Sequence, residues 1–208
     1  MRYTVWLLVM ALNLHAVVAG ASSVVAVNEE QVRSWNQFFQ ELVTLQQREH
    51  ARYELRVEQR SGEYGGEMAK GYGFVERRYF DQASGTQVSL ELRDRDHPDR
   101  LQRLEVAVLD ADGAVTREYS ATYLPWARNA PIVTTVNFHH RGGGVAAFRQ
   151  FDASGALQYE QCNGQFAGRP VALSLEYPEI RPPVTQSAVY AHCFRTLPQG
   201  AGRLLRPQ

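Results

Sequence analysis

The sequence contains only two cysteines, a single lysine and no excess of either charge, since 22 Lys plus Arg oppose 22 Asp plus Glu. A chain without net charge has no electrostatic footprint for nucleic acid or for an anionic membrane surface. After the first residues, no stretch is apolar enough to cross a bilayer. We therefore expect no nucleic-acid partner and no stable membrane span once a leader has been removed.

The short motifs that identify common enzymes and cofactor sites are also missing. The sequence has no G-x-S-x-G, no H-E-x-x-H and no C-x-x-C-H. The glycine-rich segment 62–73 lacks the phosphate-binding pattern and does not lead into a helix. No cofactor and no metal site are predicted, while an enzyme stays open because a catalytic triad need not be contiguous in sequence.

The first residues have the layout of a secretory signal peptide. Arg2 precedes an apolar run from Val5 to Leu12, and small residues surround Ala19. The run is too short for the ~20 residues that a membrane-spanning helix needs. We expect residues 1–19 to be removed and the mature chain to be periplasmic or secreted.

Two cysteines in an exported chain predict one disulfide bond, between Cys162 and Cys193. The bond would close a loop of about 31 residues and stabilise the fold by roughly 3.5 to 4 kcal/mol. The spacing of the two residues is not that of a redox pair or of a metal site.

Segment 28–48 has the periodicity of an amphipathic helix. Apolar and aromatic residues recur at intervals of three and four, at Val32, Trp35, Phe38, Phe39, Leu42 and Leu45. The stripe is typical of a helix that packs on a core. After it the period changes to two, and about nine alternating runs follow between residues 53 and 175, which favours an antiparallel sheet with one wet face.

Three connections between these runs share one pattern, in which an Asp is followed after a few residues by a Gly. The pattern occurs at Asp81, Asp110 and Asp152, and it is typical of a hairpin turn. The segment "DASG" therefore predicts a turn in which Ser154 is a structural residue and not a nucleophile.

These serial Asp-x-x-Gly hairpins, between about Gly71 and Gly164, weakly resemble the hairpin units of MORN-type repeat proteins. Taken whole, the chain is more similar to exported bacterial proteins of the cell envelope. Neither resemblance supplies a catalytic residue.

The fold class that we predict is α+β. An N-terminal amphipathic helix packs in the concave face of a curved antiparallel meander of about nine strands, as a half-barrel, and a short C-terminal helix follows. Residues 20–196 form this single domain, and residues 197–208 are predicted to be a flexible tail. The shape resembles periplasmic lipoprotein carriers of the LolA type and cystatin-like sheets by analogy only.

Two groups of residues are candidates for binding. His139, His140 and Arg141 lie together in "NFHHRGGG", but neighbouring residues on a strand point to opposite faces, so the two histidines are not expected to hold one metal ion. Tyr123, Trp126 and Arg128 lie in a connection between two prolines, and these residue types often anchor interfaces. The alternative is that Trp126 folds back over the edge of the sheet as part of the core.

The function that we predict is a non-enzymatic binding or interaction module of the bacterial envelope, with a protein or an apolar ligand as partner. One alternative is a hydrolase that uses His139 or His140 at the rim of the sheet. Another is a structural subunit of an envelope assembly.

Overall fold

The structure is a computed structural model of the 208-residue chain, and it describes residues 29–30, 32–65, 70–125 and 131–207. The signal peptide predicted at residues 1–19 lies outside these ranges. Residues 29–30 and 32–50 are helical, and we call them the N-terminal helix.

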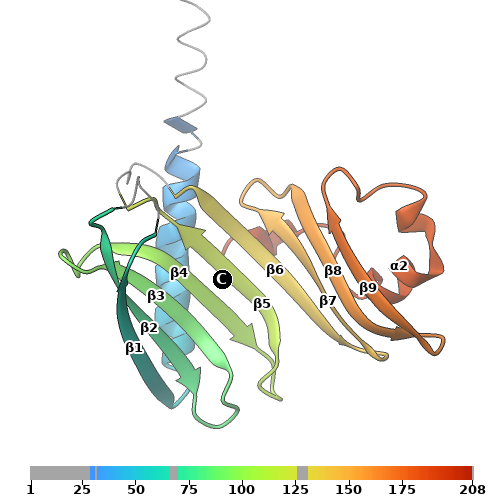
Figure 1. Ribbon diagram of the computed structural model, residues 1–208, viewed down its shortest axis with the longest axis horizontal. Coiled ribbons are helices and arrows are strands. Elements are labelled where there is room, and N and C mark those ends of the chain that lie inside the picture. The colour runs from blue at the N-terminus through green and yellow to red at the C-terminus, as the bar shows by residue number, and fades with distance from the viewer. Residues whose placement is uncertain (1–28, 31, 66–69, 126–130, 208) are drawn as a thin grey trace, which may run out of the picture.

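Nine strands and a short helix follow among the described residues (Figure 1). The strands are β1 (Leu55–Glu63), β2 (Gly73–Asp81), β3 (Gln87–Asp94), β4 (Leu101–Leu109), β5 (Val115–Thr122), β6 (Val133–Gly142), β7 (Val145–Asp152), β8 (Leu157–Phe166) and β9 (Arg169–Glu176). The 3-10 helix η2 (Val184–Gln186), the helix α2 (Ala188–Phe194) and the 3-10 helix η3 (Gly202–Leu205) complete the fold.

Each strand pairs antiparallel with the next one along the chain, so that the sheet runs in order from β1 to β9. The sheet is curved but not closed, because β1 and β9 remain at its two edges (Figure 1). This arrangement confirms the predicted α+β fold, with a helix packed on a curved antiparallel meander.

The Asp-to-Gly segments form the predicted hairpin turns. The Asp152 carboxylate accepts a hydrogen bond from the backbone N–H of Ser154 at 2.8 Å. Asp81 and Asp110 accept equivalent backbone bonds in their own turns. Gly155 has a φ of 87°, a left-handed conformation that favours glycine. Ser154 is therefore a turn residue, as the sequence predicted.

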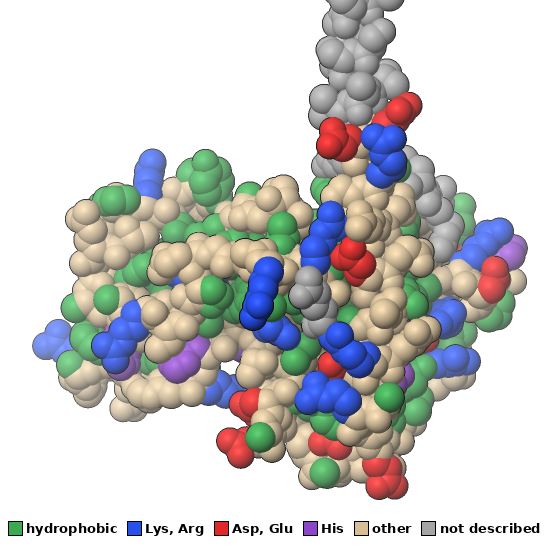
Figure 2. Space-filling view, turned by 180° about the vertical axis from the view of Figure 1, so that it is seen from behind, with side chains coloured by type: hydrophobic (Ala, Val, Ile, Leu, Met, Phe, Trp, Pro, Cys, Tyr) green, Lys and Arg blue, Asp and Glu red, His purple; other side chains and the backbone are tan. Residues whose placement is uncertain are grey.

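The apolar stripe of the N-terminal helix packs on one side of the sheet, which we call the helix face. Phe38, Leu42 and Leu45 are almost completely buried there, and the Phe39 ring meets the Tyr123 ring edge-on, with 4.9 Å between their centroids. Charged side chains of both signs cover the outward side of the helix (Figure 2). Among the described residues, no helix has the length and apolar content needed to cross a membrane.

The chain after β9 covers the remainder of the helix face. α2 packs against β7 and β8. The disulfide bond Cys162–Cys193 joins β8 to α2, with 5.9 Å between the two Cα atoms, and it confirms the predicted pairing. Both cysteines are fully buried and belong to the same core cluster as the helix stripe.

The segment after α2 also packs on the sheet. Leu197 and Ala201 are buried in the core cluster, and the Tyr119 hydroxyl donates a hydrogen bond to the carbonyl oxygen of Leu204 at 2.9 Å. The structure thus departs from the flexible tail predicted for residues 197–208. The sheet beneath this segment supplies contacts that composition alone does not reveal.

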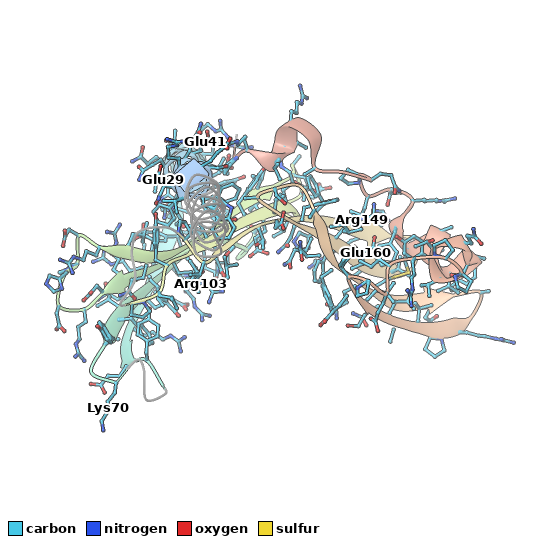
Figure 3. The ribbon with its side chains drawn as sticks, turned by 90° about the horizontal axis from the view of Figure 1, so that it is seen from above. Glu29, Glu41, Lys70, Arg103, Arg149 and Glu160 are labelled. Atoms are coloured by element: carbon cyan, nitrogen blue, oxygen red, sulfur yellow. A yellow bond between two sulfur atoms is a disulfide. The ribbon has the colours of Figure 1, made fainter. Side chains whose placement is uncertain are left out.

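A buried ion pair lies beneath this C-terminal segment (Figure 3). Arg149 on β7 donates to Glu160 on β8 at 2.5 Å, and their side chains are 1% and 0% exposed. Arg149 also donates to the carbonyl oxygen of Pro198 at 2.7 Å. The Tyr190 hydroxyl of α2 donates to Glu160 at 2.9 Å. Burial and the Glu160 carboxylate raise the pKa of Tyr190 to about 12, so this hydroxyl remains a donor.

The opposite side of the sheet, which we call the open face, is turned toward the reader in Figure 1, where the strands lie in front of the N-terminal helix. Both ends of the sheet bend toward this side (Figure 3). On β1 and β2 it carries ion pairs, because Arg60 and Arg78 each lie 2.7 Å from Glu76. The open face is therefore the hollowed side and lacks a helical cover within the described residues. The N-terminal helix packs on the other side of the sheet, and not in the concave face that the sequence predicted.

Replacing Phe38 with Ala tests the helix packing. Because the ring is 1% exposed, we expect the substitution to lower the free energy of unfolding by about 3 to 5 kcal/mol, measured by urea denaturation. Gln40→Ala on the exposed side of the same helix is the matched control and should change the value by no more than about 0.5 kcal/mol. Equal losses in both variants would contradict the packed stripe.

Replacing Arg149 with Met tests the buried ion pair. It leaves Glu160 charged without its partner, so we expect a loss of about 3 to 5 kcal/mol in the free energy of unfolding. The double variant Arg149→Met, Glu160→Leu removes both charges and should recover most of that loss, because no unpaired charge remains. A double variant as unstable as the single one would contradict the pairing.

Candidate binding surface on the open face

The register of the strands determines which side chains share the open face. β6 and β7 are joined by a two-residue turn at Gly143 and Gly144, whose φ angles are 59° and 81°. Residues directly opposite each other in an antiparallel pair lie on the same face. The pairings of β5 to β8 place two rows on the open face: Glu118, Asn137, Gln150 and Tyr159 in one, and His139, Phe148 and Gln161 in the other.

The open face has two neighbouring hollows on β3 to β8, in addition to one of about 190 Å³ among the ion-paired side chains of β1 and β2. The central hollow, of about 200 Å³, is lined by residues of β3 to β6, among them Glu105, Glu118, His139 and Arg141. The side hollow, of about 140 Å³, is lined by His139, His140, Arg141, Phe148, Gln161 and Asn163, with two alanines. Because His139 and Arg141 line both, the two hollows form one continuous depression.

A carboxylate and an imidazole lie side by side in the central hollow. His139 Nε2 is 3.7 Å from Glu118 Oε2, and the Asn137 amide donates to the same oxygen at 3.3 Å. The His139 ring holds the pKa of Glu118 below its usual range, with help from Asn137 and from the Arg103 charge, while burial acts in the opposite direction. Glu118 is therefore ionised at neutral pH.

Three aromatic rings follow one another from β6 to β8, and we call them the aromatic strip. The ring centroids of His139 and Phe148 are 5.7 Å apart, and those of Phe148 and Tyr159 are 5.5 Å apart. Successive ring planes are tilted by 37° and 44°. Each of the three side chains is half-buried, so part of each ring reaches solvent.

Amide side chains flank the aromatic strip. On one side, Gln150 donates to the Asn137 oxygen at 3.0 Å, and Asn137 donates in turn to Glu118. On the other side, the amides of Gln161 and Asn163 make no hydrogen bond within the part of the chain that the structure describes. These two amides border the side hollow and are available to a ligand.

The predicted histidine group belongs in part to this surface. His139 and Arg141 lie on the open face, opposite Phe148 and Ala146, whereas His140 pairs with Ala147 at the alternate position. The two histidines therefore do not combine on one ion. Within the described ranges, no three His, Cys, Asp or Glu side chains gather as metal ligands would.

Of the predicted aromatic group, Tyr123 is the member that lies within the described residues. Tyr123 is 7% exposed and lies on the helix face, where its hydroxyl donates to the Asn36 side chain. It is a core residue, because Phe39 of the N-terminal helix packs against its ring. Trp126 and Arg128 lie outside the described residues.

A contact between His50 and Ser89 could suggest a catalytic pair, since the two side chains are 2.7 Å apart. Ser89, however, is 1% exposed beneath the N-terminal helix, and Gln46 of the same helix donates to Glu91 at 2.7 Å. Burial lowers the pKa of His50, against the opposing charge of Glu91. This cluster pairs polar groups between helix and sheet.

A larger groove, of about 530 Å³, lies between the end of the sheet and α2. Apolar side chains line most of it, including Phe166 of β8, Val171 and Leu173 of β9, and Val189 of α2. Since β9 is an edge strand, the groove borders unpaired backbone groups. It is a second surface that could receive apolar side chains.

Sequence reasoning did not identify Glu118, Phe148 or Tyr159. Each occupies an ordinary alternating position in a strand, and no motif distinguishes it. The only available signal was the "RGGG" turn, because a two-residue turn at its last two glycines places Phe148 opposite His139.

Comparisons of the chain with protein-family models, with curated proteins and with solved structures found no match.

Replacing Glu118 with Gln tests the electrostatics of the central hollow. A carboxylate whose pKa is lowered by folding stabilises the protein above its unfolded pKa of about 4.3, and this effect is lost as the pH falls through the lowered value. We expect Glu118→Gln to cost about 0.5 to 1 kcal/mol near neutral pH. The difference from the wild type should shrink as the pH falls below about 4.3 and vanish once the pH lies below the lowered pKa of Glu118.

Urea denaturation at neutral and at acidic pH measures this difference in the free energy of unfolding. In a His139→Gln background the effect of Glu118→Gln should shrink, because the ring is the main cause of the lowered pKa. If the difference between wild type and Glu118→Gln grew as the pH fell, the lowered pKa of Glu118 would be contradicted.

Proposed function

We propose that the protein is an exported, non-enzymatic binding module of the bacterial envelope, and that its open face is the binding surface. The observation that carries this proposal is that the two faces of the sheet are covered differently. The helix face is filled by the core cluster, whereas the open face leaves half-buried rings and unbonded amides around a depression. Exposed aromatic and amide groups in a concave surface are typical of a ligand site.

The disulfide bond supports the export part of the proposal. Cys162 and Cys193 form a bond between β8 and α2, and such bonds persist in oxidising compartments such as the periplasm. The predicted leader at residues 1–19 is a second and independent support from sequence. Together they favour a periplasmic or secreted protein.

The alternative of a hydrolase would place its chemistry at His139. A general acid of a glycosidase needs a raised pKa, but the pKa of Glu118 is lowered. A nucleophile needs a hydrogen bond to its base, and His139 Nε2 receives none from any group that the structure describes. Both observations favour binding over catalysis.

The alternative of a structural subunit has one observation in its favour. The edge strand β9 borders the apolar groove beside α2, and an exposed strand edge can pair with another chain. The other edge, β1, is mostly exposed but alternates charged side chains, which discourage such pairing.

Photo-crosslinking in the periplasm distinguishes these surfaces. A benzophenone side chain at Asn163 lies beside the side hollow, one at Arg169 lies beside the apolar groove, and one at Gln40 lies on the exposed helix as a control. We expect adducts from Asn163 alone, because only the open face holds the ligand. Adducts from Arg169 alone would favour the structural subunit, and adducts from none of the three would contradict a binding module.

A further inference from the structure

Resting on the proposed function, we propose that the aromatic strip binds an extended, uncharged polysaccharide strand of β-1,4-linked pyranose rings. The strip consists of His139, Phe148 and Tyr159, and the amides of Gln161 and Asn163 lie along one side of it.

The spacing of the rings fits a chain of sugars. Successive centroids are 5.7 and 5.5 Å apart, which is close to the length of one pyranose residue along an extended chain. The electron-rich face of an aromatic ring attracts the polarised C–H groups that one side of a pyranose presents.

The amides supply the polar half of sugar recognition. A Gln or Asn side chain offers two N–H donors and a carbonyl acceptor, which match hydroxyl groups that both donate and accept. Gln161 lies directly opposite Phe148, so a sugar on that ring would have its hydroxyl groups beside the amide. Asn163 extends the same edge toward Arg141 at the end of β6.

The charges argue for an uncharged ligand. The open-face positions within the strip on β7 and β8 are Ala146, Phe148, Gln150, Tyr159, Gln161 and Asn163, and none of them is charged. Asp152 follows on the same face at the end of β7, where its carboxylate is bonded to Ser154 and Gln158. Charged groups occur only at its ends, where Glu118 and Arg141 lie on one side and Glu176 pairs with Tyr159 on the other. Stacking platforms for single-stranded nucleic acid combine rings with a positively charged groove, which this surface lacks.

Isothermal titration calorimetry with two probes tests the inference: the β-1,4-linked hexasaccharides of glucose and of N-acetylglucosamine. We expect the full mature protein to bind at least one of them. Phe148→Ala and Tyr159→Ala should each weaken binding about three- to tenfold, because each removes one stacking ring. Phe166→Ala is the matched control, an aromatic of β8 that lines the apolar groove instead, and it should leave the affinity unchanged.

The amide variants test the same site if a ring variant is too unstable for its affinity to be measured. Asn163→Ala removes an exposed side chain, and Gln161→Ala removes a half-buried one without a hydrogen-bond partner in the described chain, so both should fold and bind more weakly. Binding that none of these variants reduces would overturn the site.

The failure of this inference is distinguishable from the failure of the proposed function. If neither hexasaccharide binds while the Asn163 crosslinker still forms adducts, the open face is a binding surface for another ligand and the polysaccharide is wrong. A mature protein that binds an oligodeoxythymidine or an anionic polyuronate, but neither neutral probe, overturns the inference in the same way. Loss of the crosslinks would contradict the proposed function itself.

Discussion

The contact between the apolar stripe of the N-terminal helix and one side of the sheet is the interaction on which the rest of the structure depends. A meander of nine strands has two faces, and without a second layer neither would be dry. Phe38, Leu42 and Leu45 supply that layer over the central strands, each side chain contributing about 1.5 to 3 kcal/mol by its burial. A single helix is narrower than the sheet, so the far strands need another cover.

The C-terminal segment provides this cover although its helix is short. α2 has seven residues, and so short a helix has little stability of its own. A disulfide bond and the buried pair of Arg149 and Glu160 hold the segment in place. The sequence predicted the disulfide, because two cysteines in an exported chain leave one pairing. It did not predict the packing after Leu197, because Arg149 binds backbone carbonyl groups there, which composition cannot show.

The candidate site, too, could be predicted from the sequence only in part. The period-two pattern predicted the strands and the opposite directions of His139 and His140, because alternation is a local property of the backbone. The neighbours of His139 depend on register instead. A turn formed one residue earlier in "RGGG" would place His139 opposite Ala146 and not Phe148. The position of Tyr159 depends further on the irregular pairing after Gln150, for which the sequence has no visible signal.

The two halves of the open face differ in a way that packing does not require. On β1 and β2, arginine and glutamate side chains neutralise one another, which is sufficient for a sheet face that has only to remain in contact with water. On β6 to β8 the corresponding positions are occupied by rings and amides. The rings of His139, Phe148 and Tyr159 pack on one another, whereas the amides of Gln161 and Asn163 bond to no neighbour in the described chain. The side chains of the open face therefore change from ion pairs on β1 and β2 to rings and amides on β6 to β8, although both parts of the face are exposed to water.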